Sequence, residues 1–84
     1  MGLPSQPVTL TAEQLGELNR QLATMRHDIN NNLSLIVAAA ELMRHKPAVA
    51  ERMMNTLAEQ PAKITAAINK FSATFEEAFG ITRP

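Results

Sequence analysis

The residues best suited to chemistry lie in one polar run, from Met25 to Leu33. His27 is followed directly by Asp28, and Asn31 lies four residues after the histidine. Neutral imidazole is a nucleophile that can attack phosphorus and form a phosphoramidate. The carboxylate of Asp28 can fix the tautomer of the ring by accepting one N–H, and the amide of Asn31 can orient water or a phosphoryl oxygen. These residue types therefore allow nucleophilic chemistry, including phosphoryl transfer, centred on His27.

The same run also breaks the local preference for helix. Three consecutive asparagines, residues 30–32, are poor helix formers inside a pattern that is otherwise helical. Such local inconsistencies tend to mark functional sites. An ordinary surface histidine with a compatible neighbour would give the same pair of His27 and Asp28, so the residues alone leave both interpretations open.

The helical register sets the direction of this candidate site. If Met25 and Ile29 face the core, His27 lies two residues from each and projects about 200° around the helix from both. Asn31 lies one turn after His27, on the same side of the helix. The pattern therefore predicts a solvent-facing imidazole with a carboxylate beside it and an amide one turn away.

A first helix of about residues 11–45 must carry this site. Thr11 is suited to be its N-cap, with Gln14 placed to return the hydrogen bond, and His45 lies where it would interact with the helix dipole and the terminal carbonyls. The apolar positions expected to form the helix contact are Leu15, Leu18, Leu22, Met25, Ile29, Leu33, Ile36, Ala40 and Met43. Their steps alternate between three and four except for two consecutive steps of four after Met25, which predicts a stutter beside the site.

A second helix of about residues 47–79 follows a tight reversal near Lys46. Pro47 suits its first turn, and Gly80 suits a left-handed C-cap. Its expected apolar positions are Val49, Met53, Leu57, Ile64, Ile68, Phe71, Phe75 and Phe79. Pro61 lies in the interior, where it either kinks the helix or splits it in two; we favour a kink near residue 61 because the apolar stripe is unbroken there.

Together these elements predict an all-α fold, an antiparallel helical hairpin that homodimerises into a four-helix bundle. We expect a flexible segment at 1–10, the hairpin domain at 11–80 and a tail at 81–84. Two helices of this length cover only part of each other's apolar stripe. The hydrophobic core of a single domain of 84 residues contributes only about 3–5 kcal/mol of net stability. Cysteine is absent and the two histidines lack ligand spacing, so neither a disulfide nor a zinc ion replaces the second copy.

Composition narrows the classes of partner. Eight basic and eight acidic residues are scattered along the chain, which argues against nucleic acid and against an anionic membrane surface. No apolar run could span a bilayer and no signal peptide is recognisable, so a cytoplasmic location is expected. Only three glycines occur, far apart, so no phosphate-cradling loop and no bound cofactor or metal is predicted.

The stretch His27–Leu33 resembles the phosphoacceptor motif of the dimerisation and histidine-phosphotransfer (HisKA-like) domain of two-component sensor histidine kinases. In that motif a histidine is followed by an acidic residue and, after two more residues, by Asn or Thr. The resemblance covers Thr11–Phe79, although only the His27–Leu33 stretch is specific. It implies that His27 carries the phosphoryl group, that Asp28 assists transfer from ATP, and that Asn31 positions water for dephosphorylation of a bound response regulator.

Two departures from that family shape the expected function. Asn32 stands where many members have proline, and the family's nucleotide-binding domain is absent from this chain. We therefore expect a homodimeric phosphotransfer module, in which His27 receives a phosphoryl group from a separate ATP-binding kinase domain or a receiver and passes it to a response-regulator aspartate. The alternatives are a non-catalytic dimerisation and regulatory module that binds such a kinase or receiver domain, and a piece of a longer kinase.

Overall fold

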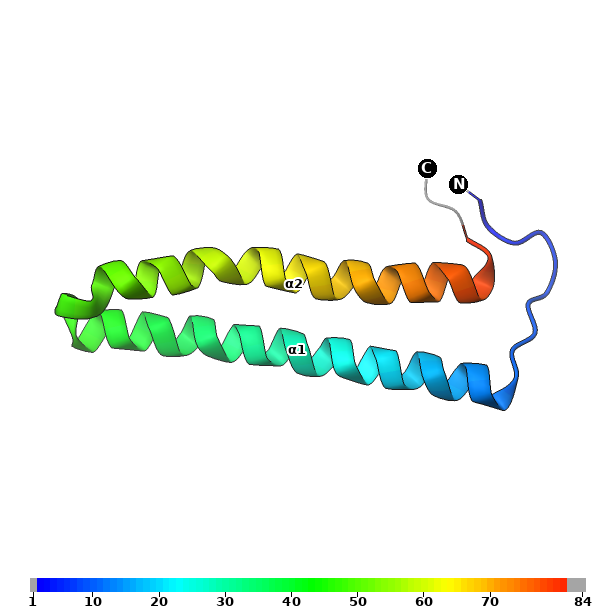
Figure 1. The fold of residues 1–84 in the computed structure, drawn as a ribbon, viewed down its shortest axis with the longest axis horizontal. Coiled ribbons are helices and arrows are strands. Elements are labelled where there is room, and N and C mark those ends of the chain that lie inside the picture. The colour runs from blue at the N-terminus through cyan, green and yellow to red at the C-terminus, as the bar shows by residue number, and fades with distance from the viewer. Residues whose placement is uncertain (1, 82–84) are drawn as a thin grey trace.

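The protein is a hairpin of two long antiparallel helices in the computed structural model, which describes residues 2–81. Helix α1 spans Ala12–His45, the 3₁₀ helix η1 spans Pro47–Val49, and helix α2 spans Ala50–Phe79 (Figure 1). No strand occurs within residues 2–81. The predicted all-α hairpin is confirmed, while the predicted tail beyond Ile81 lies outside the described residues.

The start of α1 is set by side chains that satisfy its free backbone groups. The backbone N–H of Thr11 donates to Oε1 of Gln14 at 2.8 Å, and the backbone N–H of Gln14 donates to Oγ1 of Thr11 at 3.1 Å. This reciprocal pair is the predicted capping box. Glu13 adds a negative charge at the positive end of the helix dipole. Helix α1 therefore begins where the sequence predicts.

The reversal between the helices lies at Lys46, as predicted, but it continues through a short 3₁₀ helix before the second α-helix begins. The backbone N–H of Lys46 donates to the carbonyl of Leu42 at 2.7 Å, which closes α1. Pro47 then opens η1, and the N–H of Val49 donates back to the carbonyl of Lys46 at 3.0 Å. The α-helix was predicted to begin at Pro47 and instead begins at Ala50. A proline with fixed φ and no N–H suits the first position of such a short 3₁₀ turn.

Helix α2 runs through Pro61 without interruption, so the chain does not split there. The kink near residue 61 stays a prediction. At its end, Gly80 has φ 64° and ψ 34°, a left-handed conformation that only glycine adopts without strain. The N–H of Ile81 donates to the carbonyl of Glu76 at 2.8 Å, as in a Schellman motif. The predicted C-cap is confirmed.

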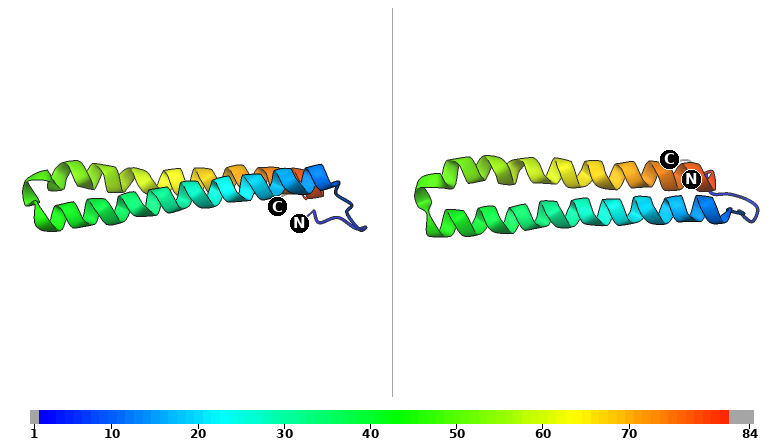
Figure 2. Two further views of the ribbon diagram at one scale, coloured as in Figure 1. Left: turned by 90° about the horizontal axis from the view of Figure 1, so that it is seen from below. Right: turned by 60° about the horizontal axis from the view of Figure 1, so that its bottom comes forward.

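The hairpin is one helix thick. It extends over 58 × 28 × 12 Å, so its smallest dimension is less than half of the next. The two helices lie side by side along their length, and the start of α1 and the end of α2 lie at the end opposite η1 (Figures 1 and 2). The radius of gyration is 18.1 Å, against about 12 Å for a compact domain of this length. One layer of helices offers no second layer against which to bury a core.

The contact between the helices follows a regular pattern, which we call the seam. On α1 the seam consists of Leu18, Leu22, Met25, Ile29, Asn32, Ile36, Ala39 and Met43, all buried or half-buried. Their steps alternate between four and three throughout, so the predicted stutter is wrong. Leu33, which was predicted to face the partner helix, is 47% exposed, and its neighbour Asn32 is only 7% exposed. Ala39 likewise replaces the predicted Ala40.

The α2 side of the seam shows the same regular spacing. Its residues are Met53, Leu57, Gln60, Ile64, Ala67, Phe71, Thr74 and Ala78. The predicted positions Ile68 and Phe75 are exposed, and Gln60, not Pro61, is buried. A strict alternation keeps two helices in contact over many turns, whereas following every apolar residue would force them to unwind locally. Regular contact therefore outweighs the cost of two buried amides.

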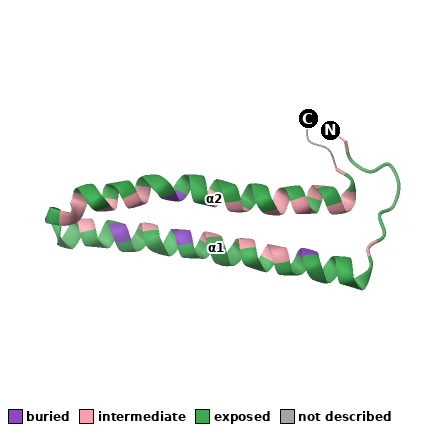
Figure 3. Cartoon of the chain, viewed as in Figure 1, coloured by how far each residue is buried: buried purple, intermediate pink, exposed green. Residues whose placement is uncertain are grey.

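Much apolar surface is left outside the seam. The buried and half-buried positions lie mainly on the sides of the helices that face each other, and the outer sides are mostly exposed (Figure 3). The large apolar residues exposed on the two helices are Leu15, Leu33, Leu35, Val37, Leu42, Met54, Ile68 and Phe75. The total exposed area is 6360 Å². A compact protein of 9.2 kDa would expose about 4,900 Å².

Candidate functional site

The predicted site residues lie near the middle of α1, with His27 and Asp28 on one turn and Asn31 on the next. All three are exposed. The seam residues on either side of His27 are Met25 and Ile29, each two residues away, so the imidazole is on the outward side of the helix. The predicted solvent exposure of His27 is confirmed. Asn31 lies one turn further on the same side. This arrangement leaves the ring accessible to another protein.

A groove of about 370 Å³ runs between α1 and α2 beside His27, and we call it the lysine groove. It is lined by Asp28, Asn31, Asn32, Lys63, Ala66, Ala67 and Lys70. Asp28 and Asn31 therefore line the same groove. His27, the residue before Asp28 on α1, does not line it. The two alanines keep the α2 wall low, so the groove is open to solvent.

The lysines are the part of the groove that the sequence interpretation missed. Lys63 and Lys70 lie seven residues apart and come directly before the seam residues Ile64 and Phe71. Asp28 comes directly before the seam residue Ile29 in the same way. In antiparallel helices these equivalent positions fall on the same side of the seam. Pairing the two heptad patterns would have found both lysines from the sequence.

The charged groups of the groove are only weakly engaged. The Nζ of Lys63 lies 3.9 Å from Oε2 of Glu59, and more than half of each side chain is exposed. Such surface pairs contribute about 0–1 kcal/mol, so this contact restrains Lys63 little. Neither Lys70 nor Asp28 forms an ion pair within 4 Å among residues 2–81. The groove therefore presents cations that a bound group can recruit.

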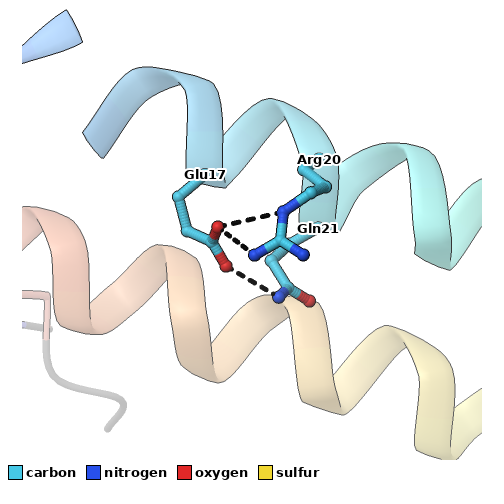
Figure 4. A network of polar contacts seen from close by, with 3 residues as sticks. All are labelled: Glu17, Arg20 and Gln21. Atoms are coloured by element: carbon cyan, nitrogen blue, oxygen red, sulfur yellow. Dashed lines mark hydrogen bonds and ion pairs between the residues drawn. The ribbon is translucent and has the colours of Figure 1, made fainter. Parts of the chain in front are cut away.

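Arg20, seven residues before His27 on α1, pairs with a neighbouring carboxylate. Arg20 donates from Nε to Oε2 of Glu17 at 3.1 Å and also pairs with it through Nη2, while Nε2 of Gln21 donates to Oε1 of Glu17 at 3.0 Å (Figure 4). The hydrogen bonds from Arg20 and then Gln21 lower the pKa of Glu17. The guanidinium of Arg20 is thus held by Glu17 and not directed at His27.

The second histidine does not belong to the site. Nε2 of His45 lies 3.2 Å from Oε2 of Glu41, one turn earlier on α1, and both side chains are mostly exposed. The predicted location in the last turn is correct, but its side-chain partner is Glu41 and not a terminal carbonyl. His45 is about 27 Å along the helix from His27 at 1.5 Å per residue. The two imidazoles cannot act on one group.

A second groove lies on the other side of the seam, and we call it the phenylalanine groove. It measures about 220 Å³ and is lined by Leu15, Leu18, Asn19, Leu22, Phe71, Phe75 and Phe79. The rings of Phe71 and Phe75 lie 6.0 Å apart between centroids, and those of Phe75 and Phe79 lie 4.6 Å apart. This groove is almost wholly apolar, whereas the lysine groove combines the two alanines with a carboxylate, two amides and two ammonium groups.

Within residues 2–81 no group of three or more His, Cys, Asp or Glu side chains is placed to hold a metal ion. Neither of the two long helices in that range combines the length and apolar character needed to cross a membrane. Comparison of the chain with protein-family models, with curated proteins and with solved structures finds no match.

Proposed function

We propose that this protein is a histidine phosphoacceptor and phosphotransfer module of two-component signal transduction, acting in the cytoplasm as a homodimer. The observation that carries the proposal is the exposed imidazole of His27, placed at the edge of a groove that holds a carboxylate, two amides and two ammonium groups. The local resemblance of His27–Leu33 to a phosphoacceptor motif agrees with this chemistry.

In the proposed transfer His27 is the nucleophile. Its neutral ring attacks the phosphorus of an aspartyl phosphate through the lone pair of one nitrogen, so an N–P bond forms while the P–O bond breaks. The aspartate leaves as a carboxylate with the bonding electron pair. Asp28 accepts a hydrogen bond from the other ring nitrogen and stabilises the positive charge that develops there. The reverse reaction delivers the group to a response-regulator aspartate. A separate ATP-binding kinase domain would donate the γ-phosphoryl group in the same way.

The proposed homodimer buries the phenylalanine groove in a four-helix bundle. The exposed area exceeds that of a compact protein of this mass by more than the about 800 Å² that each partner buries in a standard interface. Phe75 and Ile68 are 40% and 44% exposed on that side of the hairpin. A two-fold dimer through this side would leave both copies of the lysine groove facing outward.

The decisive experiment is phosphorylation of the purified chain by phosphoramidate, by candidate kinase catalytic domains and by phosphorylated receivers. Phosphoramidate transfers its phosphoryl group with release of ammonia and requires no cognate partner. We expect one acid-labile, base-stable phosphoryl group per chain, detected by intact mass and mapped to His27. His27→Ala abolishes the label, while His45→Ala, which removes the other exposed histidine, keeps it.

The proposal is rejected if no donor labels the chain, or if His27→Ala is labelled as well as the wild type. Binding of a receiver or kinase domain by an unlabelled dimer would instead support the non-catalytic regulatory module. Circular dichroism and sedimentation of each variant establish that a lost label does not reflect a lost fold.

A further inference from the structure

The lysine groove has two walls of different chemistry. The α1 wall carries Asp28 and Asn31, both within one turn of His27, and the α2 wall carries Lys63 and Lys70. Asn31 belongs to both the face of His27 and the lining of the groove. A group attached to the imidazole and turned towards α2 therefore enters a space with ammonium groups on its far side.

We propose that Lys63 and Lys70 bind the phosphoryl group carried on His27, acting as positioning residues supplied by α2. This inference rests on the proposed function, because it identifies which residues hold the transferred group. A phosphoryl group has two negative charges near neutral pH and several acceptor oxygens. Lysine meets such a group as a point charge at the end of a flexible four-carbon stem, and the amide of Asn31 can donate to another oxygen.

The other charges near the groove do not remove this attraction. Glu59 pairs with Lys63 at 3.9 Å, but the pair is exposed and easily exchanged. Asp28 is the one carboxylate in the lining, and it forms no ion pair within 4 Å with either lysine. Lys70 has no ion-pair partner among residues 2–81. The free cation of the groove is therefore Lys70, with Lys63 available by exchange.

Neighbouring arginines are less suited to this role. Arg20 pairs with Glu17 and does not line the lysine groove. Arg26 comes directly after the seam residue Met25, which places it on the side of the phenylalanine groove. The cations that share a groove with Asn31 come from α2 alone, so the site needs both helices to be paired.

The test uses inorganic phosphate, which binds as an anion but cannot phosphorylate histidine, and the amide spectrum of the ¹⁵N-labelled chain. We expect saturable shifts at the groove amides of Asp28, Asn31, Ala66 and Ala67. The double variant Lys63→Gln with Lys70→Gln weakens phosphate binding by about fivefold to tenfold. Replacing both lysines by arginine retains the binding, since the charge is kept.

The matched control is Lys46→Gln with Arg52→Gln, which removes the same charge from exposed positions outside the groove. Phosphate affinity is expected to remain at the wild-type value in this pair. The inference is overturned if the shifts fall outside the groove, or if both double variants weaken binding equally, since net charge alone would then explain the effect.

The two proposals fail in distinguishable ways. Phosphate binding in the groove together with an unlabelled His27 in every donor reaction would leave an anion site and reject the phosphoacceptor. Normal labelling of His27 without phosphate binding in the groove would reject the role of the two lysines and leave the proposed function standing.

Discussion

The side-chain amide of Gln60 donates from Nε2 to the carbonyl oxygen of Thr56 at 2.9 Å, while its Oε1 is buried with no hydrogen-bond partner among residues 2–81. The residue is only 1% exposed. A buried acceptor without a donor costs about 1–3 kcal/mol. Gln60→Met keeps the length of the side chain and removes this acceptor, so we expect it to raise the free energy of unfolding by about 1 kcal/mol. Urea denaturation measures the change.

Gln21→Met is the control for that variant. Gln21 is half-buried and its Nε2 donates to Glu17, but unlike Gln60 it has no buried Oε1 that lacks a hydrogen-bond partner. Its replacement is therefore expected to leave stability unchanged or to lower it slightly. A clear loss of stability in Gln60→Met would contradict the prediction and would mean that Oε1 has a donor in solution.

Two glycines in helical surroundings should respond to alanine in opposite directions. Gly16 lies inside α1, and a Cβ built on it meets nothing within 4 Å, so Gly16→Ala is expected to stabilise the protein by about 0.5–1 kcal/mol. Gly80 also has open space around it, but its φ is +64°, where alanine is strained. Gly80→Ala is expected to lower the thermal midpoint. Equal effects of the two variants would contradict the assigned backbone conformations.

Glu17 provides a prediction about pH. Its pKa is lowered by the hydrogen bond from Arg20 and then by that from Gln21, so the folded state prefers the ionised carboxylate. Its contribution to stability is therefore present above the unfolded pKa and lost as the pH falls through the folded pKa. Arg20→Gln removes the larger cause, and the pKa of Glu17 should rise towards its ordinary value of 4.5. A ¹³C-detected titration of the Glu17 carboxyl in the wild type and in the variant measures this shift.

The proposed dimer depends on the phenylalanine groove. Phe75→Glu places a charge in the phenylalanine groove and is expected to convert the proposed dimer into a monomer, because the charge would be buried without a partner. Leu42→Glu is matched in exposure, at 41% against 40%, but it comes directly before the seam residue Met43, on the side of the lysine groove. It should leave the dimer intact in sedimentation equilibrium. A wild-type monomer at high micromolar concentration would contradict the proposed assembly.

The start of α1 and the end of α2 were the most predictable parts of the fold. Thr11 and Gln14 form their capping box from residues three apart, and Gly80 adopts its left-handed conformation for a reason that depends on one residue alone. Such local interactions are complete within a single turn of the chain. The sequence therefore contains all the information that they need.

The register of the seam was less predictable, because it depends on both helices at once. Leu33 is more apolar than Asn32, and Ile68 is more apolar than Ala67, yet the less apolar residue of each pair faces the partner helix. The apolar stripe is wider than one partner helix can cover, and regular spacing decides which edge of it is used. The same pairing places Lys63 and Lys70 opposite Asn31, which explains why inspection of α1 alone missed them.

The end of the hairpin far from η1, where α1 starts and α2 ends, differs from the turn in how it folds and unfolds. Met43 and Met53 are separated by a short stretch of chain, so ordering it costs little entropy, whereas Leu18 and Ala78 close a loop that contains most of the protein. Once the turn has formed, each successive layer of contacts adds only a short further loop. We therefore expect the hairpin to fold from the turn outwards and to unfold first near the three phenylalanines. Self-association at the phenylalanine groove would then stabilise the end of the hairpin that forms last.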